Sequence, residues 1–214
     1  VLVIAIGPVQ DFIAAARKTR DLKNGSELLS ETAKAIAKFL QDKGVRLVFP
    51  GSAEAGAPNR IVCMCESDPG ALAEEARQAA QQHLRERAEA ALEYARQKGL
   101  YDVVDGPRLL EQVADFLAFY CAWAPMGQGQ DYAQARAGAD AALAARKGLR
   151  DFTQPPWARG LPKSSLDGGR ETIIRPEATD EKLLRLGIRR AEQLDGVSFV
   201  KRVLDMGEAR FPSV

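Results

Sequence analysis

The sequence predicts an α+β domain with an antiparallel sheet, and three observations support this prediction. Short apolar or alternating segments typical of strands are separated by longer segments with helical periodicity. These segments follow one another in the order strand, helix, strand, strand, helix, strand. Of the 214 residues, 46% are hydrophobic and 28% are charged, which is the composition of a globular protein that buries a core. Intrinsic disorder, collagen-like repeats and disulfide scaffolds are therefore excluded.

Four segments have the composition of strands. The first is apolar at every position, so we expect it in the middle of the sheet, whereas the second alternates apolar and polar residues. A small, polar loop separates the second strand from the third, so a simple hairpin would pair these two strands antiparallel. The predicted strands cover residues 1–6, 45–49, 60–65 and 116–125.

Glycine and proline residues separate the predicted helices. The helix that begins near Asp11 is expected to break at Asn24-Gly25-Ser26, where Ser26 would cap a second helix that ends at Gly44. A long helix is predicted from Asp68 to about Lys98. Shorter helices are predicted after residues 106–107 and over residues 131–150, 181–193 and 198–206.

The order of the first six elements is that of the split βαβ, or ferredoxin-like, fold. We therefore predict two parts: a ferredoxin-like domain over residues 1–150, and an irregular loop with a helical extension over residues 151–214.

Charge and cysteine content narrow the class of protein further. A net charge of +1 gives no global attraction to nucleic acid or to a membrane surface, and no apolar run is long enough to cross a bilayer. The chain does not begin with Met and has no signal-peptide pattern, so we expect a piece of a longer, cytoplasmic protein. The number of cysteines is three, and an odd number cannot form a complete set of disulfide bonds, which favours a reducing compartment. Cys63 and Cys65 are interpreted as small apolar residues on a strand.

The turn after the first strand is the first candidate site. Gly7-Pro8 joins a buried strand to the start of a helix, where unpaired backbone N–H groups can bind a phosphate. The cation Arg17 follows this turn in the sequence. A long irregular segment much later in the chain contains a second cation, Lys163, and beside it Ser164. A basic run is usually a solvated helix face, and it becomes a candidate for phosphate contact only beside other positive groups.

Several blocks of the sequence resemble one protein family. Residues 6–22 (IGPVQDFIAAARKTRDL) and 25–30 (GSELLS) are similar to the signature of the Cmr-type large subunit of type III CRISPR effector complexes. Shorter blocks in the same order also resemble that family: residues 58–60 (PNR), 113–117 (VADFL) and 160–172 (GLPKSSLDGGRET).

The resemblance implies the first of two palm domains in an antiviral, RNA-guided complex with CRISPR RNA, target RNA and other subunits as partners. In that family the two palms share an ATP site for cyclic oligoadenylate synthesis. Carried onto this chain, the nucleotide-binding residues would be Gly7, Pro8, Val9, Gln10, Phe12, Arg17, Lys163 and Ser164.

The sequence also departs from the family. It lacks the Gly-Gly-Asp-Asp turn of the second palm and the His-Asp pair of the nuclease domain, so we expect no catalytic residue here and no activity of this chain alone. Mg²⁺ or Mn²⁺ would be held only by residues outside it. The family's zinc cysteines would fall between Arg175 and Lys201, but this stretch contains no cysteine, and residues 187–203 are interpreted as at most a degenerate remnant of the zinc region.

Two alternatives stay open at this stage. The chain could be an inactive palm that acts only as a scaffold in the complex. It could also be an unrelated small domain that binds an anion or a nucleotide.

Overall fold

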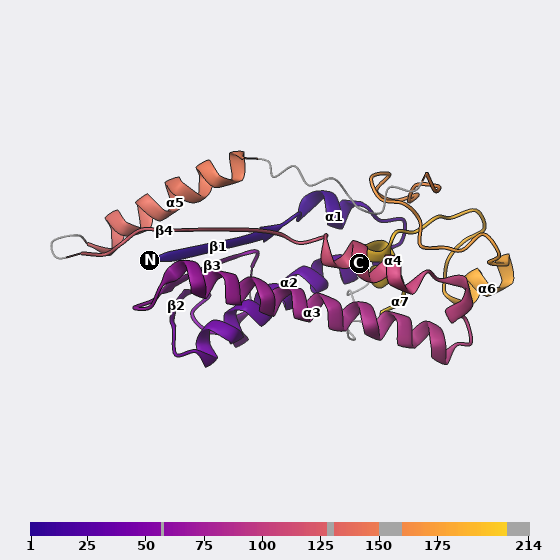
Figure 1. The fold of residues 1–214 in the computed structure, drawn as a ribbon, viewed down its shortest axis with the longest axis horizontal. Coiled ribbons are helices and arrows are strands. Elements are labelled where there is room, and N and C mark those ends of the chain that lie inside the picture. Colours follow the sequence, from indigo (N-terminus) through magenta and orange to yellow (C-terminus); the bar gives the residue numbers. More distant parts are fainter. Residues whose placement is uncertain (57, 128–130, 150–159, 205–214) are drawn as a thin grey trace, which may run out of the picture. The chain divides into compact units, whose positions relative to one another are not determined.

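The computed structural model describes residues 1–56, 58–127, 131–149 and 160–204, and it confirms the α+β class. The strands are β1 (Leu2–Gly7), β2 (Arg46–Phe49), β3 (Arg60–Met64) and β4 (Ala118–Trp123) (Figure 1). The helices are α1 (Gln10–Ala14), α2 (Thr19–Asp42), α3 (Pro69–Gln97), α4 (Gly106–Ala114), α5 (Tyr132–Gly148), α6 (Asp180–Arg185) and α7 (Gly196–Val203).

The chain forms two compact units, and each of them is discontinuous in sequence. The sheet unit contains residues 1–9, 29–84 and 117–156, and the helical unit contains residues 10–28, 85–116 and 157–214. The division of the chain at residues 150 and 151 stays a prediction; residues 150–159 lie outside the described part of the chain.

The sheet has the strand order β2-β3-β1-β4, and every neighbouring pair is antiparallel. β1 lies in the middle, as its apolar sequence predicts: Ile4 pairs with Ile61 on one side and with Cys121 on the other. The predicted antiparallel pairing of the second and third strands is confirmed.

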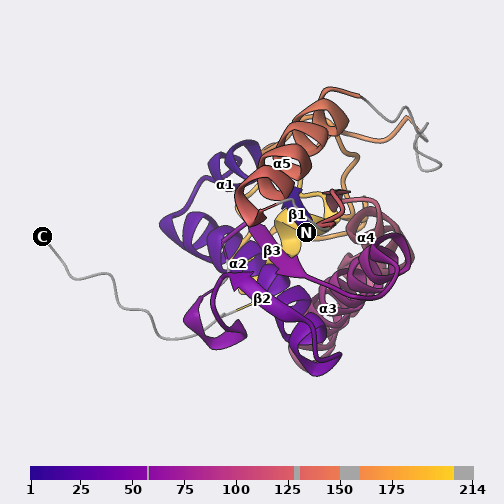
Figure 2. The same cartoon turned by 90° about the vertical axis from the view of Figure 1, so that its left-hand side faces the viewer.

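Alternate residues of β1 face two different cores. Leu2, Ile4 and Ile6 lie in a core with apolar residues of α2 and α3, whereas Val3 and Ala5 lie in a core with apolar residues of α5. Figure 2 shows α5 on one side of the strands and α2 with α3 on the other. Because both faces are covered, every residue of β1 is buried.

The predicted break in the first helical segment is wrong, because α2 runs without interruption from Thr19 to Asp42. Gly25 permits a close approach instead of a turn: a Cβ there would lie 3.0 Å from Cδ of Lys201. Asn24 is buried, and its Nδ2 donates hydrogen bonds to the carbonyl oxygens of Lys201 (2.7 Å) and Leu204 (2.5 Å). These residues serve tertiary packing and do not end the helix.

The last two predicted helices are present, but their bounds differ from the prediction. α6 ends at Arg185 because Gly187 and Ala191 adopt positive φ angles of 71° and 60°, which a helix cannot contain. α7 begins at Gly196, because the Asp195 carboxylate accepts hydrogen bonds from the next backbone N–H groups. Residues 205–206 of the predicted last helix lie outside the described residues.

Gly196 is required by packing between α7 and α4. A Cβ at this position would lie 2.9 Å from Cα and from the carbonyl oxygen of Leu109, and backbone atoms cannot move aside cheaply. We therefore expect Gly196→Ala to lower the free energy of unfolding by about 1–3 kcal/mol in urea denaturation, as overpacked substitutions do.

Gly51→Ala is the matched control, because nothing lies within 4 Å of a Cβ at that position. Its stability should equal or slightly exceed that of the wild type. Equal stability of the two variants would contradict the close packing of α7 on α4.

Candidate functional site

The residues predicted to bind a nucleotide belong to both compact units. Gly7, Pro8 and Val9 belong to the sheet unit, where Gly7 ends β1. The other predicted residues belong to the helical unit: Gln10, Phe12, Arg17, Lys163 and Ser164.

Gly7 is not required by the chain's own structure. Its φ is not positive, and a Cβ there would lie 3.9 Å from the backbone nitrogen of Val9 and 4.0 Å from Cβ of Ala118, which are ordinary contacts. α1 is a short helix of five residues. The groups that this turn can offer an anion are the backbone N–H groups at the start of the helix. A glycine leaves that backbone open to a ligand.

Phe12 and Ser164 are used inside the helical unit. The Phe12 ring is buried, with its centroid 4.5 Å from that of Phe116 and 4.2 Å from Nζ of Lys201. Ser164 is buried as well, and its Oγ accepts a hydrogen bond from the backbone N–H of Leu166. The side chains of Phe12 and Ser164 therefore take part in the internal packing of the helical unit.

Arg17 and Lys163 keep exposed cationic groups. Nη2 of Arg17 lies 3.5 Å from the carbonyl oxygen of Ser165, a weak hydrogen bond, so Arg17 lies beside the loop that carries Lys163. Nζ of Lys163 donates to the carbonyl oxygen of Gly169 at 3.3 Å. Both side chains could turn toward an anion at little energetic cost.

A buried ion cluster lies at the centre of the helical unit. Arg202 is fully buried, and its guanidinium donates hydrogen bonds to Asp21 (2.7 Å, twice) and to Glu192 (3.0 Å, twice). Burial alone would raise the pKa of both carboxyl groups, but the hydrogen bonds and charge of Arg202 outweigh it and hold both pKa values below their usual range. The cluster is therefore ionised at neutral pH.

A second buried cation supports the turn between α1 and α2. Nζ of Lys201 donates hydrogen bonds to the carbonyl oxygens of Phe12 (2.6 Å) and Ala15 (2.7 Å). Burial lowers the pKa of this amine to about 8. The role is structural, because the amine satisfies two backbone groups at the end of α1.

We expect Arg202→Met to destabilise the chain by about 3–5 kcal/mol, because it leaves Asp21 and Glu192 buried without their counter-ion. Urea denaturation measures this loss. The triple variant Asp21→Asn, Glu192→Gln, Arg202→Met should be more stable than the single variant, since it removes the uncompensated charges.

Arg190→Met is the control, because Arg190 is 87% exposed and pairs with Asp180 at the surface. It should change stability little. A single Arg202→Met variant that is as stable as this control would show that the buried cluster contributes nothing.

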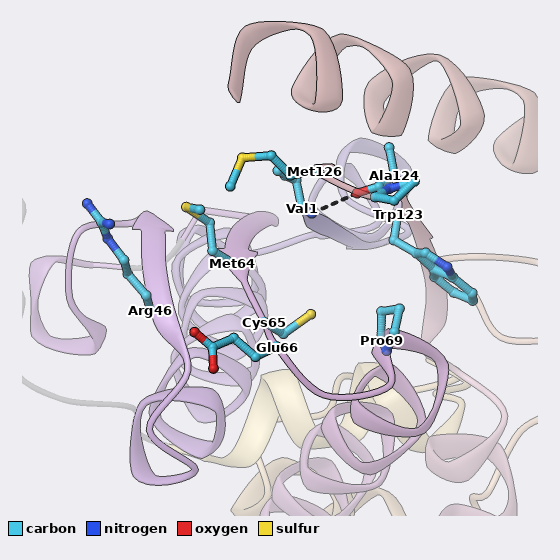
Figure 3. Close-up of a pocket in the computed structure, with 10 residues that line it drawn as sticks. Val1, Arg46, Met64, Cys65, Glu66, Pro69, Trp123, Ala124 and Met126 are labelled. Atoms are coloured by element: carbon cyan, nitrogen blue, oxygen red, sulfur yellow. Dashed lines mark hydrogen bonds between the residues drawn. The ribbon is translucent and has the colours of Figure 1, made fainter. Parts of the chain in front are cut away.

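The sheet unit contains a cavity of about 720 Å³ at the ends of its strands. Figure 3 shows Met64, Trp123 and Met126 around it, and Arg46 and Glu66 contribute the charged groups. Trp123 is 46% exposed. A mainly apolar lining of this size suits an apolar side chain or a small organic molecule.

Sequence reasoning missed this cavity and the ion cluster. The only signal for the cavity was a tryptophan at the end of a strand, which was interpreted as part of the apolar segment. The signal for the cluster was Arg202 among the apolar residues of the last helix, where a charge usually points to solvent.

Cys63 is buried on β3, and burial raises the pKa of its thiol to about 12. It is therefore an inert core residue. Within the described ranges no group of three or more His, Cys, Asp or Glu residues could hold a metal ion. No helix within those ranges is long and apolar enough to cross a membrane.

Comparisons with known proteins agree with the resemblance seen in the sequence. Residues 1–54 match the family model of the N-terminal part of CRISPR-associated protein Cmr2. No curated protein matches the chain.

The fold is similar to a chain in a cryo-EM structure of the type III-B Cmr-beta bound to cognate target RNA, with a TM-score of 0.57 and 14% sequence identity. The match covers 94% of this chain and 32% of that chain, so this chain spans about a third of its length. Together the two findings confirm the resemblance to a part of the Cmr large subunit.

Proposed function

We propose that this chain is the first palm domain of the large subunit of a type III CRISPR effector complex. The observation that carries the proposal is the family match over residues 1–54, which contain β1, the turn at Gly7, the whole of α1 and α2, and β2. The strand order β2-β3-β1-β4 supports a ferredoxin-like palm, because the split βαβ fold places its strands in this order.

Within such a complex the chain forms one wall of an ATP site, and a second palm forms the other wall. Backbone groups at Gly7, Pro8, Val9 and Gln10 contact the nucleotide, and a cation from Arg17 or Lys163 approaches its phosphates. The fit rests on Gly7, which neither backbone conformation nor packing inside the chain requires. Carboxylates of the second palm hold the metal ions.

The partners follow from the same assignment. Other subunits of the complex surround the chain, and CRISPR RNA and target RNA are bound by the assembly. The similar chain of known structure belongs to an assembly bound to target RNA, which supports this part of the proposal.

We expect Gly7→Ala to leave the free energy of unfolding within about 1 kcal/mol of the wild type and to weaken ATP binding at least tenfold. The added methyl group fits the chain but occupies the space that a nucleotide would use.

Lys163→Ala should weaken ATP binding about tenfold or more by removing a charge-assisted contact. Titration calorimetry on the chain assembled with its second palm measures both effects.

Gly127→Ala is the control, since nothing lies within 4 Å of a Cβ there. Unchanged ATP affinity in both test variants, in an assembly that still forms, would refute the nucleotide wall. That result would favour a palm that acts only as a scaffold.

A further inference from the structure

β4 is an edge strand of the sheet, and only half of its backbone polar groups point toward β1. The backbone nitrogen of Val1 donates to the carbonyl oxygen of Ala124 at 2.8 Å, and that of Ala124 donates to the carbonyl oxygen of Val1 at 3.0 Å. Hydrogen-bonded pairs alternate along an antiparallel ladder. The backbone groups of Tyr120 and Ala122 therefore also point toward β1.

By the same alternation, the backbone groups of Phe119, Cys121 and Trp123 point outward. The residue paired with Phe119 confirms this arrangement: the N–H of Ile6 donates away from β4, to the carbonyl oxygen of Asn59. β4 is the last strand in the order β2-β3-β1-β4. Within the described part of the chain, the outward N–H and carbonyl groups of β4 therefore have no hydrogen-bond partner.

The two edges of the sheet differ in how they are protected. β2 has four residues, carries the exposed charge of Arg46, and shifts its register with β3 between Leu47 and Phe49. Short length, charge and irregular pairing all protect an edge strand from pairing with another chain. β4 pairs with β1 in unbroken register from Ala118 to Trp123 and contains neither a charged residue nor a proline. It is therefore a template for a further strand.

The two faces of β4 present different side chains to such a strand. Cys121 packs against the core that contains residues of α2 and α3, and Trp123 lines the cavity of the sheet unit (Figure 3). On the opposite face, Cζ of Arg146 and Nζ of Lys147 lie 5.8 Å and 5.9 Å from the ring centroid of Tyr120. A strand beside β4 would thus meet apolar groups on one face and cations on the other.

We propose that the outer edge of β4 binds an extended segment of a protein partner in which apolar and acidic residues alternate. The segment pairs antiparallel to β4, as all neighbouring strands of this sheet do. Its apolar residues lie opposite Phe119, Cys121 and Trp123 and share hydrogen bonds with them. The residue opposite Tyr120 is acidic, because it faces the two cations. The proposal does not depend on the ATP wall.

The test is amide hydrogen exchange of the purified chain, followed by NMR with and without the peptide acetyl-VEVEVEV-amide. In the free chain, the outward amides of Cys121 and Trp123 should exchange faster than the inward amides of Tyr120 and Ala122. Saturating peptide should slow exchange of the outward amides at least about tenfold. A peptide with lysine in place of glutamate should bind about two- to fivefold more weakly.

Cys121→Pro removes an outward N–H and leaves the bonds to β1, which Tyr120 and Ala122 form. It should weaken peptide binding about tenfold. Cys121→Ala is the matched control, because it changes the side chain and keeps the N–H, and its affinity should stay within about twofold of the wild type. A peptide N-methylated at its valines should not bind to the wild type, and this result does not depend on folding of the proline variant.

Other results overturn the proposal. No protection by the peptide, or equal binding of the N-methylated peptide, would show that the edge does not pair with a strand. Equal losses in the two Cys121 variants would assign the binding to the side chain. Protection of the outward amides in the free chain would show that the edge is already covered. Protection that rises with protein concentration would identify a second copy of this chain as the cover.

Discussion

The guanidinium of Arg202 joins segments of the helical unit that are far apart in sequence. It is fully buried, so both of its carboxylate partners must be in place before the unit can exclude water. Asp21 comes from the start of α2 and Glu192 from the segment before α7. The same arrangement explains the continuous α2, since Asn24 and Gly25 are packed against the α7 region. The cluster also commits both carboxylates to Arg202.

Most of the sheet could be predicted because its signals are local. β1 is apolar throughout, β2 and β3 are separated by a short polar loop, and Gly99 with its positive φ follows the long α3. The errors arose where tertiary contacts override local preference. A glycine such as Gly25 is typical of a helix break. Here the close approach of Lys201 explains why the position is a glycine. The positive φ of Ala191, a residue that favours helices, could not be expected from its identity.

The candidate site was predictable only as a set of residues. The turn at Gly7 follows from the order of strand, glycine and helix, and the family resemblance singled out the same block. The burial of Phe12 and Ser164 could not be foreseen, because it depends on Phe116 and on the loop around Leu166.

The role of Arg202 as the centre of the helical unit is tested most directly by native-state hydrogen exchange on the wild-type chain. If the ion cluster couples its segments, the most protected amides of residues 20–28 and of α7 should share one opening free energy, because neither segment can open without exposing the cluster. Amides of α7 that exchange through a clearly lower opening free energy, while those of residues 20–28 stay protected, would contradict this role.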